Sequence, residues 1–241
     1  MFIDMIPEII IAALILIFLV IAPLMIHSKL RMPARPEFAP MDPGGCPAGV
    51  LEFFNLSTRE LEKEGFTVVA DAVQTETGSL PNQTTYIRLL VNQKAGDAAM
   101  CAYSEVKIQN TKQVEKYVEF CTEFSTNKEV STNNSKMPTI FKKFPEKQLF
   151  QFPNIKDLHY LYEIHTRETG KFVDRFSRKI LPPKGRELEH LSTSMTKDME
   201  RQVKMGYFYL DRSAHVYRPT LKGAYFMTWK TIFKLFGRKK R

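Results

Sequence analysis

The histidines and cysteines are the residues of this 241-residue chain that could carry out chemistry, and their spacing gives no catalytic pattern. His159 and Glu163 are four positions apart and would share one face of a helix. His165 falls on another face, so two metal ligands do not converge. His190 and His215 have no acidic or cysteine partner close by in the sequence. The sequence therefore predicts no metal site and no cofactor.

The three cysteines are Cys46, Cys101 and Cys121, an odd number without a C-x-x-C spacing. This is typical neither of a secreted disulfide framework nor of a zinc site. A hydrolase that uses Cys101 or Cys121 with a histidine stays an alternative, because such partners meet only in the folded protein. No G-x-S-x-G, Walker-type or G-x-G-x-x-G loop occurs. We therefore expect a binding or scaffolding protein and not an enzyme.

The N-terminus contains an uncharged apolar run of 18 residues, from Ile9 to Ile26. At about 1.5 Å per residue it covers roughly 27 Å of a bilayer core about 30 Å thick. Asp4 and Glu8 precede it, where a cleaved signal peptide would have cations. The sequence therefore predicts a retained single-pass transmembrane helix, a signal-anchor, within residues 1–31.

The flanks of this run predict its orientation. Lys29, Arg31 and Arg35 follow the run, whereas no Lys or Arg precedes it. Because cations stay on the cytoplasmic side, we expect the N-terminus outside and the body in the cytoplasm, at a plasma or inner membrane. A lumenal body would instead offer glycosylation triplets, which begin at Asn55, Asn82 and Asn133.

Residues 32–49 hold five prolines and three glycines, which predicts a stiff linker. Residues 50–153 form the next predicted domain, in which the capping box Ser57–Glu60 predicts one short helix over residues 58–64. Five runs of alternating residues follow, with short connections and no helix between them, which predicts an antiparallel sheet of about five strands. The runs are residues 66–73, 85–91, 98–108, 114–124 and 148–152.

In the fourth run, Phe120 and Glu119 fall on opposite faces of the predicted sheet, the first buried and the second toward solvent. The predicted fold class is therefore α+β. It consists of an N-terminal single transmembrane helix, this sheet packed with helices, and a helical subdomain with a β-hairpin.

Residues 154–241 are predicted to contain that subdomain. Apolar residues recur at helical spacing over about 155–180 and 186–205. Residues 206–220 predict a two-stranded hairpin, and residues 221–236 predict a basic last helix. This helix, hairpin and helix order, with "YRPTLKGA" leading into the last helix, resembles the end of a winged-helix domain.

The resemblance implies a membrane-tethered regulator that binds nucleic acid, as the alternative to a scaffolding protein. The contact residues that it implies share one face of the helix before the hairpin, with Asp198 and Glu200 between them. They are Lys197, Arg201 and Lys204.

The formal net charge of +9 indicates an anionic partner. Beside a membrane, anionic lipid headgroups attract cations, and the last helix combines lysines with aromatic residues as interfacial helices do. The expected partners are therefore the lipid bilayer and its anionic headgroups, an unidentified protein and, as the alternative, nucleic acid. The candidate membrane-surface residues are Lys230, Lys234, Arg238, Lys239, Lys240 and Arg241.

Overall fold

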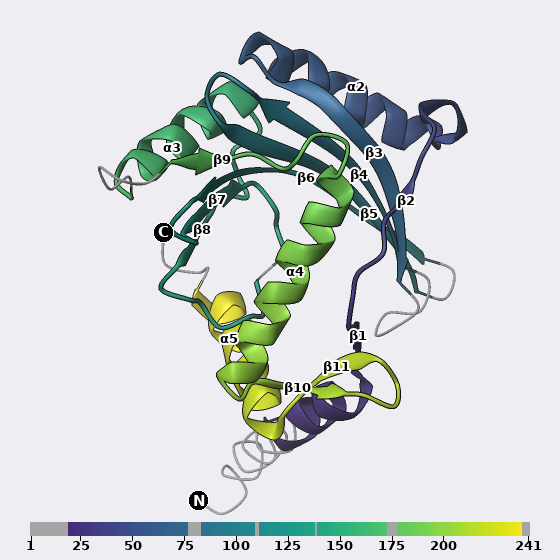
Figure 1. The fold of residues 1–241 in the computed structure, drawn as a ribbon. Helices are drawn as coiled ribbons and strands as arrows, with labels where there is room; N and C mark the ends of the chain where they lie inside the picture. The colour runs from purple at the N-terminus through teal and green to yellow at the C-terminus, as the bar shows by residue number, and fades with distance from the viewer. Residues whose placement is uncertain (1–18, 77–82, 109–110, 138, 173–177, 238–241) are drawn as a thin grey trace, which may run out of the picture. The chain divides into compact units, whose positions relative to one another are not determined.

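The computed structural model describes residues 19–76, 83–108, 111–137, 139–172 and 178–237. The chain divides into two compact units, each with a sheet and a hydrophobic core of its own (Figure 1). Each unit is assembled from segments that are distant in the sequence. Unit 1 comprises Met1–Ala34, Pro138–Lys142 and Lys197–Arg241, and unit 2 comprises Arg35–Met137 and Lys143–Thr196.

Unit 2 is built on a curved eight-stranded sheet in the order β2-β3-β4-β5-β6-β7-β8, with β9 paired to β6. Neighbouring strands are antiparallel, except that β7 and β8 are parallel. The strands are β2 (Ala39–Pro40), β3 (Thr67–Glu76), β4 (Gln83–Asn92), β5 (Asp97–Ile108), β6 (Thr111–Phe124), β7 (Glu129–Asn133), β8 (Lys147–Gln151) and β9 (Lys179–Ile180).

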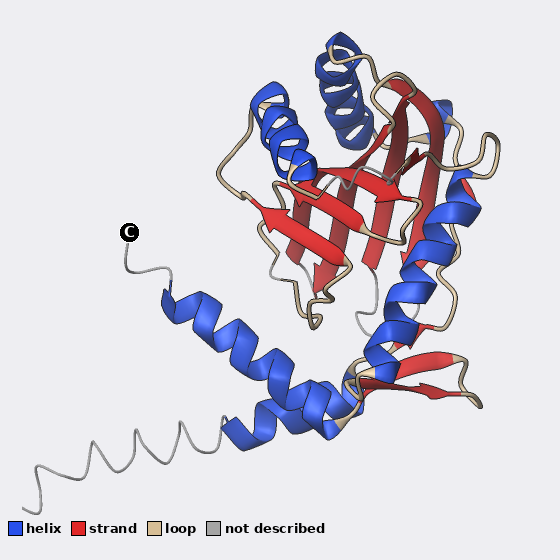
Figure 2. Ribbon diagram, turned by 60° about the vertical axis from the view of Figure 1, so that its left-hand side comes forward, coloured by secondary structure: helices blue, strands red, loops and turns tan. Residues whose placement is uncertain are grey.

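Two helices, α2 (Ala48–Lys63) and α3 (Leu158–Gly170), cover one face of this sheet (Figure 2). Asp157 begins α3 because its side chain accepts a hydrogen bond from the Tyr160 N–H at 3.0 Å. Phe54 and Leu61 of α2 belong to the same buried cluster as Phe120 of β6. The core of unit 2 therefore lies between the two helices and one sheet face, with further members Leu90, Cys101, Val118 and Leu161.

A buried ion pair lies in this layer beneath α2. Arg88 of β4 donates to both carboxylate oxygens of Asp71 on β3, at 2.7 and 2.8 Å. Its third hydrogen bond goes to the Thr58 hydroxyl of α2 at 3.2 Å, and its guanidinium carbon lies 5.0 Å from the ring centre of Phe54. Both charged side chains are over 90% buried, so the bidentate geometry is what makes their burial tolerable.

A second buried carboxylate, Asp97, begins β5. It accepts hydrogen bonds from Thr122 of β6 at 2.6 Å, from Tyr162 of α3 at 2.8 Å and from Lys179 of β9 at 2.7 Å. Because a buried carboxylate needs hydrogen-bond partners, these contacts connect four elements of unit 2 at one point. Gly96, with φ +73°, makes the tight turn that places Asp97 there.

His165 of α3 extends this network and is fully buried. The Thr122 hydroxyl donates to Asp97, so it accepts a hydrogen bond from His165 Nε2 at 2.9 Å. Burial lowers the pKa of this imidazole to about 4, so the ring is neutral at pH 7. His165 Nδ1 therefore accepts a hydrogen bond from the Thr132 hydroxyl of β7 at 3.1 Å.

The α+β class is confirmed, but the sheet is larger than predicted and mixed. Two of the additional strands, β2 and β9, are two residues each. All five residues of β7 are buried although four of them are polar. The strand therefore has no alternation of apolar and polar residues by which the sequence could predict it. The last predicted run is β8, which pairs in parallel with β7 and not as part of a meander.

The predicted transmembrane helix is contradicted. Within the part of the chain that the structure describes, no helix is both long and apolar enough to cross a membrane. Residues 19–29 are helical, and the first half of the predicted span lies outside the described residues. The prediction rested only on the length and apolar character of this run. The predicted single-pass topology, with a cytoplasmic body at a plasma or inner membrane, depended on the same helix and loses its support as well.

Several element boundaries also differ from the predictions. The predicted helix over residues 58–64 begins ten residues earlier, because α2 starts directly after Pro47 and includes the end of the predicted linker. The predicted linker also contains β1 (Met32–Pro33) and β2. The predicted long helix over 155–180 ends at Gly170, and its last residues form β9.

The predicted faces of β6 are confirmed, but the environment of one face is not. Phe120 is fully buried, and Glu119 lies on the opposite face. Glu119 is half-buried there and accepts a hydrogen bond from Asn133 at 2.6 Å. Burial raises the pKa of this carboxyl. The second face of the sheet is therefore not simply solvated.

The His165 network makes unfolding pH-dependent. The unfolded chain binds a proton at the ordinary histidine pKa of about 6.5, whereas the folded chain binds it only at about 4. The contribution of His165 to the free energy of unfolding is therefore fully present above pH 6.5. It falls by up to about 3 kcal/mol as the pH drops toward 4. In urea titrations at pH 7.5 and 4.5, we expect the His165→Gln variant to lose this part of the pH dependence. An unchanged pH dependence would contradict a neutral buried imidazole.

Candidate nucleic-acid interface

Unit 1 carries the net positive charge of the chain. Its segments contain 15 Lys and Arg and five Asp and Glu, a formal net charge of +10. The whole chain has +9, so −1 remains for unit 2. The basic character of the protein is therefore a property of one unit, and a polyanion would be attracted to that unit.

The scaffold of unit 1 is a three-stranded antiparallel sheet in the order β1-β11-β10. β10 (Phe208–Asp211) and β11 (Val216–Pro219) form the predicted hairpin, which is confirmed, and β1 pairs with β11. The last half of α4 (Glu187–Lys204) precedes the hairpin and α5 (Leu221–Gly237) follows it. The core is a cluster of apolar side chains from the two helices and the hairpin: Met199, Phe208, Tyr217 and Met227.

A buried glutamine fixes the position of α4 in this unit. Gln202 is 1% exposed, and its amide nitrogen donates to the Lys142 carbonyl at 2.8 Å while its amide oxygen accepts from the Lys142 N–H at 3.3 Å. The side chain therefore satisfies both backbone groups of one residue, as a neighbouring strand would. Residues 139–142 are held in unit 1 in this way.

The junction between the hairpin and α5 is tightly packed. Thr220 caps α5 by accepting from the Gly223 N–H at 3.1 Å, and its hydroxyl donates to the Gly206 carbonyl at 2.8 Å. His27 of the N-terminal helix contacts the Pro219 carbonyl at 2.8 Å through Nδ1. A Cβ atom at Gly223 would overlap with the carbonyl oxygen of Tyr207, so only glycine fits at this position.

The three predicted contact residues of α4 lie on the side of the helix away from the core. Lys197 and Lys204 are exposed, whereas Met199 and Gln202 on the other side are buried. Arg201 is half-buried and lies 3.2 Å from Asp198, which neutralises part of its charge. The helix therefore presents two exposed lysines and one paired arginine along a single stripe.

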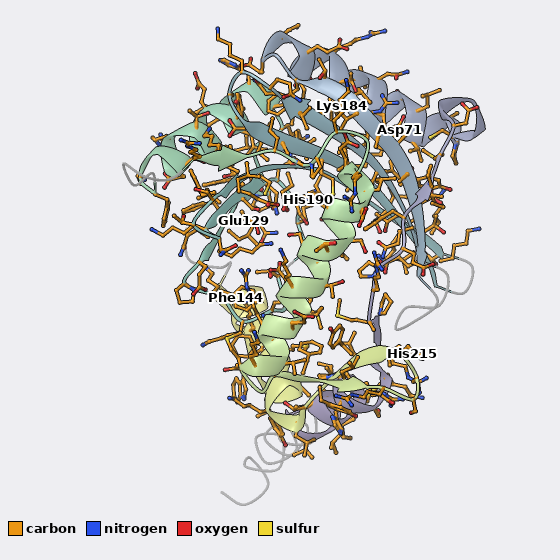
Figure 3. The ribbon with its side chains drawn as sticks, in the orientation of Figure 1. Asp71, Glu129, Phe144, Lys184, His190 and His215 are labelled. Atoms are coloured by element: carbon orange, nitrogen blue, oxygen red, sulfur yellow. The ribbon has the colours of Figure 1, made fainter. Side chains whose placement is uncertain are left out.

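The turn of the hairpin adds one cationic and one polar position that sequence reasoning missed. Arg212 and His215 are exposed at this turn, where Figure 3 labels His215. Asp211 shapes the turn by accepting from the Ser213 hydroxyl at 2.7 Å and the Ala214 N–H at 3.2 Å, and His215 adopts a left-handed φ of +52°. The hairpin pattern marks these residues as a turn, and only the charge of Arg212 could have marked it as a contact.

The candidate membrane-surface residues have mixed placements. Lys230 donates to the Phe141 carbonyl at 2.7 Å and lies 5.5 Å from the ring centre of Phe226, so it stabilises unit 1. The side chain of Lys234 lies outside the described part of α5, as do the four residues that follow Gly237: Arg238, Lys239, Lys240 and Arg241. These cations remain predictions.

The structure does not bring the histidines together. His159 is exposed and contacts Glu64 at 2.7 Å and Glu163 at 3.4 Å. His165 is buried in the Asp97 network, and His190 contacts Glu123 at 2.9 Å. Among the described residues, no group of three or more His, Cys, Asp and Glu side chains could hold a metal ion.

The cysteines lie in environments that oppose thiolate formation. Burial raises the pKa of Cys101 to about 12, and burial also raises that of Cys121 well above its ordinary value. Cys121 donates to Glu129, so its neighbour is a carboxylate that disfavours the thiolate further. Cys46 is half-buried, and its pKa is raised by burial as well.

Comparison with protein-family models, curated proteins and solved structures gives no match.

Substitution of Gly223 tests the close approach of α5 to the hairpin in unit 1. We expect Gly223→Ala to destabilise the protein by about 1–3 kcal/mol, because the added methyl group forces the Tyr207 backbone away from α5. Gly170→Ala is the matched control, since nothing lies within 4 Å of a Cβ there. Thermal unfolding measures both variants. Equal melting temperatures for the Gly223 variant and the parent would show that α5 does not approach the hairpin as described.

Proposed function

We propose that this chain is a binding protein and not an enzyme, and that unit 1 binds nucleic acid through phosphate contacts. The observation that carries the proposal is the separation of charge between the units, +10 in unit 1 and −1 in unit 2. Nucleic acid is a dense polyanion, and binding to it scales with the number of phosphates that Lys and Arg neutralise.

The stripe on α4 and the hairpin turn supply the contacts. Lys197 and Lys204 are exposed and lie about two turns apart on one side of a helix. Each lysine could therefore contact a different phosphate of one nucleic-acid backbone. Arg212 adds a cation on the hairpin, and His215 adds an exposed polar group beside it. These are positioning contacts to the backbone of the nucleic acid, which give affinity without selecting a base sequence.

The non-enzymatic part of the proposal is supported by the state of the possible nucleophiles. Cys101 is fully buried and its pKa is raised to about 12, so almost no thiolate is present at neutral pH. His165 makes hydrogen bonds to Thr122 and Thr132 through its two ring nitrogens. Neither group is accessible to a substrate, and this opposes a cysteine hydrolase built from them.

Binding is tested with the full-length chain and a fluorescein-labelled DNA duplex of 25 base pairs by fluorescence anisotropy. If about four phosphates are neutralised, the affinity falls by about 100-fold between 50 and 200 mM salt. The double variant Lys197→Glu/Lys204→Glu should bind at least tenfold more weakly at 100 mM salt. It should also reduce the slope of log affinity against log salt by about two, one for each lost phosphate contact.

The matched control reverses the same amount of charge on unit 2. Lys94 and Lys184 are exposed there, and Figure 3 labels Lys184. The variant Lys94→Glu/Lys184→Glu should retain the affinity of the parent within about threefold. Equal losses from both double variants would show that only total charge matters, and no salt-dependent binding by the parent would refute the proposed function.

Thiol chemistry separates this proposal from the hydrolase alternative. We expect Cys101 not to react with a thiol reagent such as 5,5′-dithiobis(2-nitrobenzoate) at pH 7 in the native protein, and to react after unfolding in urea, because burial suppresses both its thiolate and its access. Mass spectrometry of the labelled peptides identifies the cysteine. Rapid labelling of Cys101 in the folded chain would favour a catalytic thiol.

A further inference from the structure

The first half of β6 has an open edge. β6 pairs with β5 along its length, from Thr111 opposite Ile108 to Cys121 opposite Ala98. On its other side β7 pairs only with Glu119–Glu123. Among the described residues, no strand lies beside residues 111–117 on that side. An edge of this kind presents backbone N–H and C=O groups that another strand can bind.

The register identifies which backbone groups face outward. Asn134 donates its N–H to the Val118 carbonyl at 3.3 Å, and its side chain accepts from the Val118 N–H at 2.8 Å. Val118 therefore turns its backbone groups away from β5. Because strand residues alternate, Lys112, Val114 and Lys116 do so as well. Gln113 and Glu115, between them, turn toward β5.

After Asn134, the chain that follows β7 bonds a side chain of β6 and not its backbone. One carboxylate oxygen of Glu115 accepts from the Ser135 hydroxyl at 2.6 Å and from the N–H groups of Lys136 and Met137 at 2.8 and 3.0 Å. These donors are satisfied by a side chain and not by the backbone of β6. The segment therefore leaves the sheet at Asn134 and does not extend β7 along β6.

The surroundings of the edge favour an acidic occupant with apolar side chains. Lys112 and Lys116 flank Val114 on one face, and Val114 is 43% exposed. Lys116 Nζ lies 5.0 Å from the ring centre of Tyr103, and Lys112 pairs with Glu105. At the end of this edge near Val118 lies a pocket of about 190 Å³ that is lined by apolar and charged side chains. Its walls include Phe53, Leu56, Glu60, Lys116, Lys156 and Leu158.

A second copy of this chain fits the edge poorly. In an antiparallel pairing centred on Val114, Lys112 of one copy would lie opposite Lys116 of the other on the same face, and this would occur twice. Like charges directly opposite each other in a sheet are destabilising. Edge lysines are a common device against such self-association.

We propose that the outer edge of β6, residues 111–117, is a strand-addition site for an extended acidic peptide segment of a partner protein. The segment lies antiparallel to β6, with carboxylates opposite Lys112 and Lys116 and a β-branched residue opposite Val114. This site lies in unit 2 and is independent of the proposed nucleic-acid interface.

The probe is a fluorescein-labelled peptide with the core Glu-Thr-Val-Thr-Glu, capped at both ends, titrated with the full-length chain. We expect saturable binding that Val114→Pro weakens at least tenfold, because proline removes an outward N–H without breaking the ladder to β5. Val114→Thr keeps that N–H and should bind like the parent. The circular dichroism spectrum and melting temperature of each variant verify that the sheet is intact.

Charge reversal tests the chemistry of the occupant. The variant Lys112→Glu/Lys116→Glu should lose the acidic peptide and bind the peptide with the core Lys-Thr-Val-Thr-Lys. Amide hydrogen exchange read residue by residue provides a measurement that needs no variant. The acidic peptide should slow exchange at Lys112, Val114 and Lys116 and leave Gln113 and Glu115 unchanged.

Four outcomes would overturn the proposal. The first three are no binding of the acidic peptide at millimolar concentration, equal binding by the Val114→Pro variant, and uniform protection of odd and even residues. The fourth is a concentration-dependent dimer that Val114→Pro abolishes, which would assign the edge to a second copy.

Discussion

The burial of the Asp97 carboxylate is the constraint on which the architecture of unit 2 depends. A carboxylate that is 1% exposed must be fully hydrogen-bonded, because leaving it unpaired would cost several kcal/mol. Its donors come from Thr122 in the sheet, Tyr162 in the covering helix and Lys179 in a two-residue strand. A network of this kind is satisfied only when all of its members are present, so it specifies one arrangement of these elements where apolar packing alone would tolerate several.

Much of unit 2 could be predicted from the sequence because its strands alternate in hydrophobicity and are separated by turns. The four runs that became β3 to β6 follow this rule, and so does the assignment of Phe120 to the core. β7 could not be predicted in this way, because it is buried throughout although it is mostly polar. Thr132 contacts His165 of α3 and Glu129 pairs with Lys147 of β8, and local periodicity contains no information about such pairs.

The same distinction applies to the candidate site. The stripe of Lys197, Arg201 and Lys204 follows from helical spacing, and the structure places it on the solvent side of α4. Lys142, by contrast, is held in unit 1 by the side chain of Gln202, 60 positions away in the sequence, and by the ring of Phe226. The transmembrane prediction was wrong for a related reason. Length and hydropathy describe a segment in isolation and contain no information about its apolar contacts in the fold. Ile26 and Leu30, for example, pack against the core of unit 1.

The discontinuous assembly of unit 1 has a consequence for synthesis on the ribosome. Unit 2 is complete once residue 196 has emerged, and nearly all of its sequence is contiguous. Unit 1 needs β1 near the N-terminus and β11 near the C-terminus. The two strands pair Met32 with Tyr217 and Pro33 with Val216, and the second pair is 183 positions apart in the sequence. Domains generally fold as units while the chain is being made. The first apolar segment therefore waits, with its side chains uncovered, for the whole of unit 2 to be translated, and that interval is when the nascent chain most needs a chaperone.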